Sequence, residues 1–163
     1  MHKMRLVHRD IKPDNTFINI KDGEKEVGLG DFGTARYINE SNEFKLERNE
    51  SINTTTVGSG FYTSPEMKAE KPNGTQTDLW SFGVTIGVII GLDDICPVGY
   101  KGGVPGFIKD CAAGKHDLWL HEQEIYISPV FTPLLKNILM VDPSKRFTMQ
   151  QVLDHPYVTK NLE

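Results

Sequence analysis

Short apolar runs occupy the first part of the chain and are separated by turns. Residues 6–29 contain the runs "LV", "TFINI" and "VGL", and "KDGE" lies between the last two. Apolar runs of this length around an Asp-Gly pair are typical of two antiparallel strands joined by a tight turn. The pattern therefore predicts a β-hairpin near the start of the chain, with a loop ahead of it.

A helical spacing of apolar residues follows Pro65. The segment "TDLWSFGVTIGVIIG" predicts a buried helix with Thr77 as its N-cap, and "TMQQVLDHPYV" predicts a short amphipathic helix that stops near Pro156. Three- and four-residue spacing predicts a further helix with these apolar positions: Phe131, Leu134, Leu135, Ile138 and Leu139. The fold class expected is mainly α, with the small β-hairpin making it α+β.

Two segments lack such a pattern. Residues 39–56 are polar with scattered charge, which predicts a surface loop. Residues 96–106, "CPVGYKGGVPG", are rich in Gly and Pro and predict irregular structure. Neither segment indicates a linker that would divide the chain, so we expect one domain.

Composition excludes several classes of protein. The 163 residues carry a formal net charge of -4, which argues against nucleic acid and anionic membranes as partners because both attract Lys and Arg. The apolar run 82–92 is too short to span a bilayer. Cys96 and Cys111 form no disulfide or metal-binding spacing, and Cys111 with His116 and His121 is a poor metal site. We expect a cytoplasmic or nuclear protein.

The glycines of "GLGDFG", residues 28–33, have the G-x-G-x-x-G spacing of a dinucleotide-binding turn. That motif would indicate a nucleotide-dependent oxidoreductase, but it requires a βαβ context and a helix that opens at its end. The residues that follow are "TARYINESNEF", which do not predict a helix. We therefore interpret the glycine spacing as incidental.

The segment "HRDIKPDN", residues 8–15, is the most specific pattern in the chain. It places Asp10, Lys12 and Asn15 in one tight loop, where an anion, a cation and a neutral amide can converge on a small reacting centre. An ordinary charged turn would require no such spacing.

Five motifs in order resemble those of the eukaryotic protein kinases: "HRDIKPDN", "DFG" at 31–33, "SPE" at 64–66, "DLWSFG" at 78–83 and "DPSKRFT" at 142–148. Lys12 and "GSGFYTSPE" resemble the serine/threonine class. The resemblance covers about residues 6–158. It implies a kinase C-terminal lobe over residues 1–158, a tail at 159–163, and phosphoryl transfer from ATP to Ser or Thr of a protein substrate.

The resemblance also implies roles for individual side chains. Asp10 would be the base that orients the substrate hydroxyl, and Lys12 would steady the transferring phosphoryl group. Asn15 and Asp31 would bind the Mg²⁺ that bridges the phosphates of ATP. Phe17 would lie beneath the adenine ring, and packing of the same side chain in the core is compatible with that position.

Other matched positions are expected to be structural. His8 is expected to be a packed histidine, and Asp78 to accept hydrogen bonds from the backbone of the loop that carries Asp10. Glu66 and Arg146 resemble a buried ion pair, whose disruption would leave an unpaired charge.

Regulation is expected in the segment "NTTTVGSGFYTSPE". Ser59 stands where the family places a hydroxyl that bonds to the catalytic Asp and Lys, and Thr55 aligns with an activating phosphosite. Arg9 and Arg36 would bind the phosphate of that site.

Kinases of this family bind ATP between two lobes, and no glycine-rich phosphate loop or strand-borne lysine stands before residue 8. We therefore expect the N-terminal lobe to be missing and an apolar face near His8 and Phe32 to be exposed, unless an N-terminal lobe or a partner protein covers it. We expect this chain alone to bind Mg-ATP weakly and to transfer little phosphate. The alternative is a truncated, non-catalytic kinase-like module that binds partners or substrates through "GFYTSPE".

Overall fold

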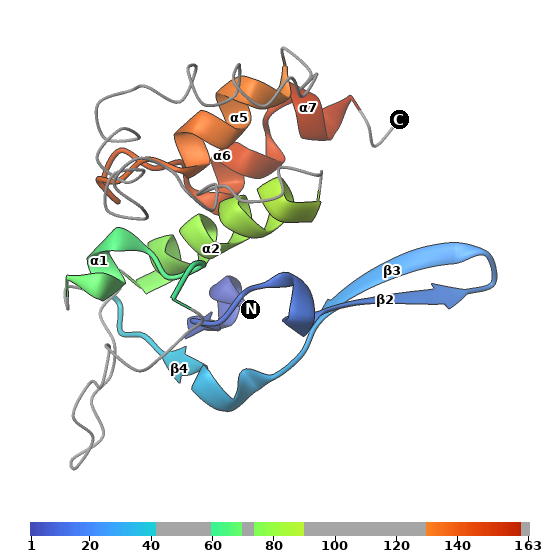
Figure 1. Ribbon diagram of the computed structural model, residues 1–163, viewed down its shortest axis with the longest axis horizontal. Coiled ribbons are helices and arrows are strands. Elements are labelled where there is room, and N and C mark those ends of the chain that lie inside the picture. Colours follow the sequence, from blue (N-terminus) through green and yellow to red (C-terminus); the bar gives the residue numbers. More distant parts are fainter. Residues whose placement is uncertain (42–59, 70–73, 90–129, 161–163) are drawn as a thin grey trace. The chain divides into compact units, whose positions relative to one another are not determined.

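A computed structural model describes residues 1–41, 60–69, 74–89 and 130–160 of the chain (Figure 1). The chain divides into two compact units, Met1–Thr85 and Ile86–Glu163. The two units are described in turn.

The first unit contains two small antiparallel sheets. β1 (Leu6–Val7) pairs with β4 (Arg36–Tyr37), and β2 (Thr16–Lys21) pairs with β3 (Glu24–Leu29). Single 3₁₀ turns accompany the strands: η1 (His2–Met4) precedes β1, η2 (Pro13–Asn15) lies between β1 and β2, and η3 (Phe32–Thr34) lies between β3 and β4. The loop of residues 8–15 therefore lies between β1 and β2.

The β2–β3 hairpin is the one predicted from sequence, and the structure confirms it. Lys21 pairs with Glu24, which leaves Asp22 and Gly23 as the two-residue turn. Their φ angles are 53° and 86°, both in the left-handed region that a type I′ turn requires. The Asp-Gly pair supplies this geometry because glycine has no Cβ and Asp tolerates positive φ.

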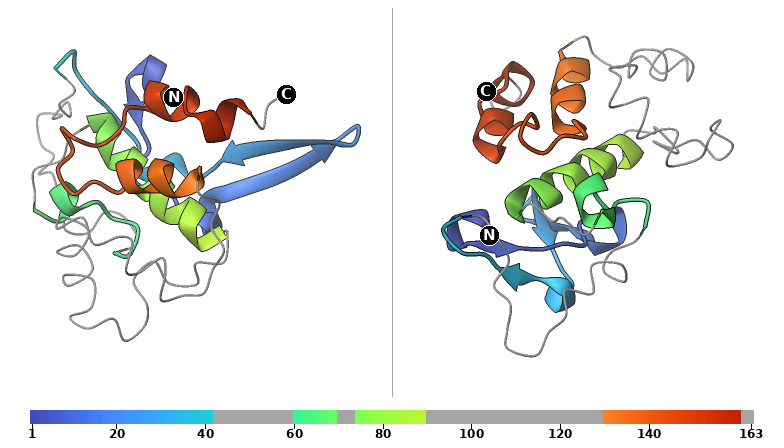
Figure 2. Two further views of the ribbon diagram at one scale, coloured as in Figure 1. Left: turned by 90° about the horizontal axis from the view of Figure 1, so that it is seen from above. Right: turned by 90° about the vertical axis from the view of Figure 1, so that its left-hand side faces the viewer.

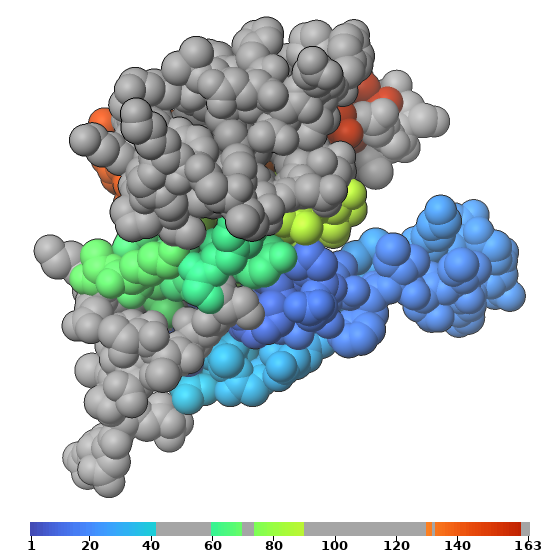
Figure 3. Space-filling model, in the orientation of Figure 1, coloured from blue at the N-terminus to red at the C-terminus, as the bar shows by residue number. Residues whose placement is uncertain are grey.

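Most side chains of this hairpin are exposed. Ile18 and Val27 are cross-strand partners, and Ile20 lies on the same face, two residues from Ile18. Ile18, Ile20 and Val27 are 67%, 67% and 71% exposed. Figures 1 and 2 show the hairpin extending away from the rest of the first unit, and its atoms form a separate projection in Figure 3. The hairpin therefore adds almost nothing to the apolar core.

The helices of the first unit are α1 (Pro65–Lys68) and most of α2 (Gly74–Ile89). Ser64 caps α1, since its Oγ accepts a hydrogen bond from Met67 N at 3.4 Å. Residues of α2 contribute to the buried apolar set of this unit: Val7, Ile11, Ile38, Met67, Leu79, Trp80 and Val84.

The predicted N-cap of α2 is wrong. The helix begins at Gly74, three residues before Thr77, so Thr77 lies within it. Thr77 is 2% exposed and therefore faces protein rather than a helix end in solvent. A Thr-Asp pair before an apolar run is a common pattern at a helix N-terminus. Here Thr77 and Asp78 are both buried and lie within the helix, so the pair does not mark its start.

The described part of the second unit contains α5 (Phe131–Ile138), α6 (Met149–Leu153) and α7 (Pro156–Thr159). The apolar positions predicted for α5 are all buried: Phe131, Leu134, Leu135, Ile138 and Leu139. Thr148 and Gln151 form a capping box at α6. The single predicted helix near Pro156 is two short ones, because Pro156 takes the first position of α7 rather than only ending α6.

Several sequence expectations lie outside the described residues. These are nearly all of the polar segment 39–56, the Gly- and Pro-rich segment 96–106, the end of the apolar run beyond Ile89, and Cys96, Cys111, His116 and His121. Within the described part of the chain, none of the helices has the length and apolar character needed to cross a bilayer.

Candidate active site

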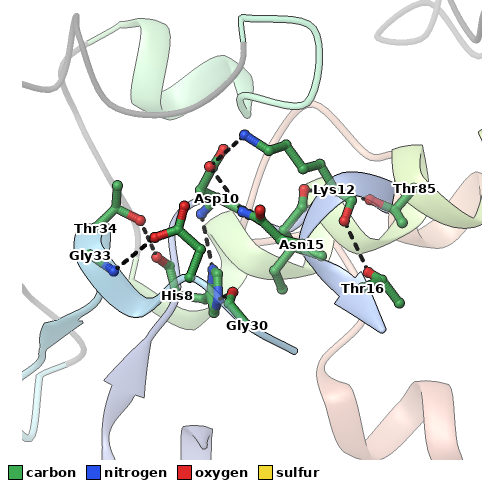
Figure 4. A network of polar contacts seen from close by, with 11 residues as sticks. His8, Asp10, Lys12, Asn15, Thr16, Gly30, Gly33, Thr34 and Thr85 are labelled. Atoms are coloured by element: carbon green, nitrogen blue, oxygen red, sulfur yellow. Dashed lines mark hydrogen bonds and ion pairs between the residues drawn. The ribbon is translucent and has the colours of Figure 1, made fainter. Parts of the chain in front are cut away.

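Asp10 is the centre of a polar cluster in the loop of residues 8–15, here called the catalytic loop after the role that the resemblance to protein kinases implies. Its Oδ2 atom lies 2.8 Å from Lys12 Nζ and accepts a hydrogen bond from Asn15 Nδ2 at 3.1 Å (Figure 4). The amide of Asn15 also donates to the Asp10 carbonyl at 2.9 Å. Asp10 is 8% exposed, so these contacts hold the carboxylate in one orientation. The structure thus brings together the three residues that the sequence pattern singled out.

The amide of Asn15 is oriented by these bonds. A carboxylate and a carbonyl only accept hydrogen bonds, so the NH₂ group of Asn15 must face Asp10. The amide oxygen Oδ1 then points away from Asp10. A neutral oxygen in this position is a suitable ligand for a hard cation such as Mg²⁺.

Lys12 is charged and paired. Its hydrogen bond to Asp10 is the main cause of a raised Lys12 pKa, and the nearby carboxylates of Asp14 and Asp31 add to it against the desolvation of the ammonium group. The side chain is 17% exposed. Lys12 therefore presents a permanent positive charge beside Asp10.

Asp31 lies just beyond β3 and is exposed. Its φ of 55° is left-handed, and its Oδ1 accepts a hydrogen bond from Gly33 N at 3.3 Å. The preceding residue, Gly30, donates its N–H to Asn15 O at 2.9 Å, which ties the Asp31 segment to the catalytic loop. No group of three His, Cys, Asp or Glu side chains suited to a metal occurs among the residues described. A metal ion here would need ligands besides Asn15 and Asp31, such as phosphate oxygens and water.

His8 is fully buried and its ring has two polar contacts. Its Nε2 lies 2.9 Å from Gly30 O, and its Nδ1 accepts a bond from Asp10 N at 3.4 Å. These partners place the ring proton on Nε2, because a carbonyl accepts and an amide donates. The ring also packs on Phe32 with centroids 4.8 Å apart, and Phe32 is 49% exposed. His8 is packed, as the sequence interpretation expected, and Phe32 provides part of the predicted exposed apolar face.

Asp78 of α2 anchors the backbone of the catalytic loop. Its Oδ2 accepts from His8 N at 2.9 Å and its Oδ1 accepts from Arg9 N at 2.8 Å. Arg9 has a left-handed φ of 68°, a conformation that a non-glycine residue adopts only when its surroundings enforce it. The two bonds to Asp78 supply that enforcement, and the backbone contact expected from sequence is present.

Sequence reasoning did not identify His2 as part of this site. Its Nε2 lies 2.8 Å from Asp78 Oδ2, and Asp78 is 1% exposed. A buried carboxylate needs donors from several directions, and His2 provides a side-chain donor beside the two backbone amides. The signal was weak, because a lone histidine six residues before His8 has no recognisable motif spacing.

Two hydroxyls of α2 were also missed. Ser81 Oγ donates to Tyr62 O at 2.8 Å, just ahead of α1. Thr85 Oγ1 lies 3.4 Å from Ile11 O and 2.7 Å from Ser81 O, which makes its contact with the catalytic loop the weaker one. Figure 4 shows Thr85 beside this loop. Their four-residue spacing on a helix was the signal available from sequence.

The segment after Asp31 is joined to the same loop. Thr34 Oγ1 donates to His8 O at 2.8 Å, and Arg9 Nε donates to Thr34 O at 2.6 Å. Arg36 Nη1 donates to Ala35 O at 2.9 Å. The predicted phosphate-binding role of Arg9 and Arg36 stays a prediction, since Thr55 and Ser59 lie outside the described residues.

Phe17 is 58% exposed, which excludes the core-packing interpretation of this residue. It lies at the base of the hairpin, two residues after Asn15. Its position beneath a nucleotide base stays a prediction.

The predicted ion-pair residues are both buried. Glu66 of α1 is 7% exposed in the first unit, and Arg146 is 3% exposed in the second, where its Nε donates to Met140 O at 3.0 Å. Their pairing with each other stays a prediction.

The stretch "GLGDFG" does not form a dinucleotide-binding turn. Its first residues end β3, which pairs antiparallel with β2, and its last residues belong to the 3₁₀ turn η3. The oxidoreductase hypothesis requires a parallel βαβ unit at this stretch, and the antiparallel β2–β3 pair takes its place.

Comparison with known proteins agrees with the site. The family model for the protein kinase domain matches residues 1–158. Calcium-dependent protein kinase 34 of Arabidopsis thaliana is 31% identical over 99% of this chain, and a probable serine/threonine-protein kinase, mkcD, of Dictyostelium discoideum is 34% identical over 98%. The serine/threonine-protein kinase STE20 of Candida glabrata is 34% identical over the whole chain.

These relatives are longer proteins. The chain spans 28% of the Arabidopsis kinase, 22% of the Dictyostelium kinase and 16% of the Candida kinase. The match nevertheless includes the catalytic loop, Asp31 and α2, and extends to residue 158. This chain belongs to the protein kinase family.

Proposed function

We propose that residues 1–158 form the C-terminal lobe of a serine/threonine protein kinase, which transfers the γ-phosphoryl group of ATP to a Ser or Thr hydroxyl of a protein substrate. The observation that carries this proposal is the contact of Lys12 and Asn15 with one oxygen of Asp10. Lys12, two residues after Asp10, favours the serine/threonine class, and two of the relatives are named as serine/threonine kinases.

Asp10 acts on the substrate hydroxyl. A buried carboxylate held by two donors is suited to accept a hydrogen bond from the attacking hydroxyl and to take its proton. Lys12 fixes Asp10 and offers a positive charge to the phosphoryl group in transfer. Phosphoryl transfer depends mainly on such positioning and charge stabilisation, and both are provided in one short loop.

Asn15 and Asp31 would hold Mg²⁺ bound to ATP, and that ion would neutralise charge on the phosphates. The donor set fits a hard cation, because it consists of an amide oxygen turned away from Asp10 and an exposed carboxylate. The hydrogen bond from Gly30 N to Asn15 O holds the segment that carries Asp31 beside the segment that carries Asn15. Asp78 maintains the backbone on which all of these side chains depend.

The test compares two carboxylates of the same loop. Asp10→Asn removes the proposed base, whereas Asp14→Asn changes an exposed neighbour. Purified chain is assayed for Mg²⁺-dependent ATP binding and for transfer from radiolabelled ATP to a Ser/Thr peptide mixture. We expect binding in all three proteins, and any transfer to fall about 100-fold or more in Asp10→Asn alone.

Binding is the primary readout, because little transfer is expected from this chain by itself. ATP binding that disappears with EDTA and with Asp31→Ala supports the proposal. A chain that binds no nucleotide, or transfer that Asp10→Asn leaves unchanged, contradicts it. Binding of substrate proteins without nucleotide would instead favour the non-catalytic module.

A further inference from the structure

The ring of Phe17 lies against the backbone of Gly30, where the chain leaves the hairpin. A Cβ atom at Gly30 would lie 3.2 Å from Phe17 Cδ2 and would overlap Cε2. Among the described glycines, a positive φ occurs at Gly23 and Gly74 and not at Gly30. A Cβ atom at position 30 therefore conflicts with the present position of the Phe17 ring and not with the backbone conformation.

The backbone of Gly30 is fixed from both sides. Its N–H donates to Asn15 O at 2.9 Å, and its carbonyl lies 2.9 Å from His8 Nε2. Leu29, the residue before it, pairs with Thr16. A side chain added at position 30 would therefore displace the ring of Phe17 rather than the backbone.

We propose that Gly30 is a positioning residue of the nucleotide site and acts through Phe17. Without a side chain, Gly30 lets the aromatic ring rest on the backbone that joins Asn15 to Asp31. The ring is thus placed at a set position relative to the proposed metal ligands and presents its exposed surface to the planar base of a nucleotide. This inference rests on the proposed function and adds to it a residue that controls the base end of the site.

The chemistry favours a planar base over an aliphatic group. Phe17 is 58% exposed although it is a large aromatic residue. An aromatic ring can stack on any nucleotide base, and the strength of the stacking depends on the position of the ring. The Gly30 backbone that supports the ring also bonds to Asn15. The base of a bound nucleotide would therefore contact Phe17, its metal-bound phosphates would contact Asn15 and Asp31, and the Gly30 backbone would join the two contact regions.

The first experiment uses the ligand-free chain. Nuclear Overhauser contacts between the Phe17 ring and the Gly30 Hα protons are measured in the wild type and in Gly28→Ala, and the corresponding contacts are sought in Gly30→Ala. Gly28 is the cross-strand partner of Phe17, but a Cβ there meets nothing within 4 Å, which makes Gly28→Ala the matched control. We expect the ring to move in Gly30→Ala only.

The second experiment compares Mg²⁺ complexes of ATP and of tripolyphosphate, which lacks a base. We expect Gly30→Ala to weaken ATP binding about tenfold and to leave tripolyphosphate binding unchanged. In a Phe17→Leu background, Gly30→Ala should have no further effect on ATP, because the ring it displaces is gone. Gly28→Ala should bind both ligands like the wild type.

The inference is wrong if Gly30→Ala and Gly28→Ala bind ATP alike, if tripolyphosphate binding falls as much as ATP binding, or if the effect of Gly30→Ala persists without the Phe17 ring. It is also wrong if the ring stays in place in Gly30→Ala. In all of these outcomes the wild type still binds ATP, so the proposed function stands. A wild-type chain that binds neither ligand overturns the proposed function and this inference with it.

Discussion

The catalytic loop and the β2–β3 hairpin are neighbours in the chain but are held in opposite ways. Most of the loop is buried, and it is fixed by bonds from distant residues, most of all by Asp78 to the amides of His8 and Arg9. The hairpin is exposed and is held mainly by its own ladder and its Asp-Gly turn. The side chains of Asp10, Lys12 and Asn15 therefore stand on a backbone that depends on long-range contacts, whereas the hairpin is a local structure.

The largest effect is expected from the loop's anchor. Asp78→Ala leaves the amides of His8 and Arg9 buried without their acceptor, which should lower the free energy of unfolding by roughly 2–6 kcal/mol. Urea titration followed by tryptophan fluorescence measures the loss. Asp14→Ala, at an exposed position of the same loop, should change it by less than about 0.5 kcal/mol. Equal effects of the two variants would show that Asp78 is not an anchor.

The same substitution in the two regions gives a second test. Val7 is fully buried next to the catalytic loop, and Val27 on the hairpin is 71% exposed. Val7→Ala should cost roughly 2 kcal/mol of stability from lost burial and the cavity left behind. Val27→Ala should cost less than about 1 kcal/mol, because mainly cross-strand contact is lost. Thermal and urea unfolding check the difference, and a reversed order would mean that the hairpin is buried in solution.

A change at the turn should affect the hairpin alone. Gly23 has a φ of 86°, so Gly23→Ala forces an alanine into the left-handed region at a cost of about 1 kcal/mol. Amide hydrogen exchange should become faster along β2 and β3 and stay unchanged at His8 and Arg9. Faster exchange in the hairpin and also at His8 and Arg9 would show that the hairpin and the catalytic loop do not unfold independently.

The smallest effect concerns the Lys12–Asp10 pair and pH. The Lys12 pKa is raised above its ordinary value of 10.5, so the pair's contribution is complete below that pH and is lost as pH rises through the raised pKa. The stability difference between wild type and Lys12→Met should stay constant between about pH 7 and 9 and shrink above about pH 10.5. Lys3→Met, at an exposed lysine, should show no such change. A difference that grows at high pH would contradict the raised pKa.

Local signals predicted much of the fold. The Asp-Gly turn predicted the hairpin, and three- and four-residue spacing predicted the buried side of α5, because both depend on near neighbours in the chain. The start of α2 was misplaced at Thr77, since tertiary burial rather than a capping pattern decides where that side chain lies.

The site was predictable in part. The loop motif placed Asp10, Lys12 and Asn15 together, as the structure shows. His2, Ser81 and the close approach of Phe17 to Gly30 were missed, since each is a contact between residues far apart in sequence or a matter of space around a backbone. Such contacts leave no periodic pattern in the chain.

The most direct test of the central claim locates the metal–nucleotide complex in the chain. Mn²⁺-ATP replaces Mg²⁺-ATP, and paramagnetic broadening of assigned NMR resonances is measured. We expect the strongest broadening at the Asn15 side-chain amide and at the Asp31 amide, and little at Asp22 in the hairpin turn. Broadening that is absent, uniform, or strongest away from Asn15 and Asp31 would contradict a phosphoryl-transfer site in the catalytic loop.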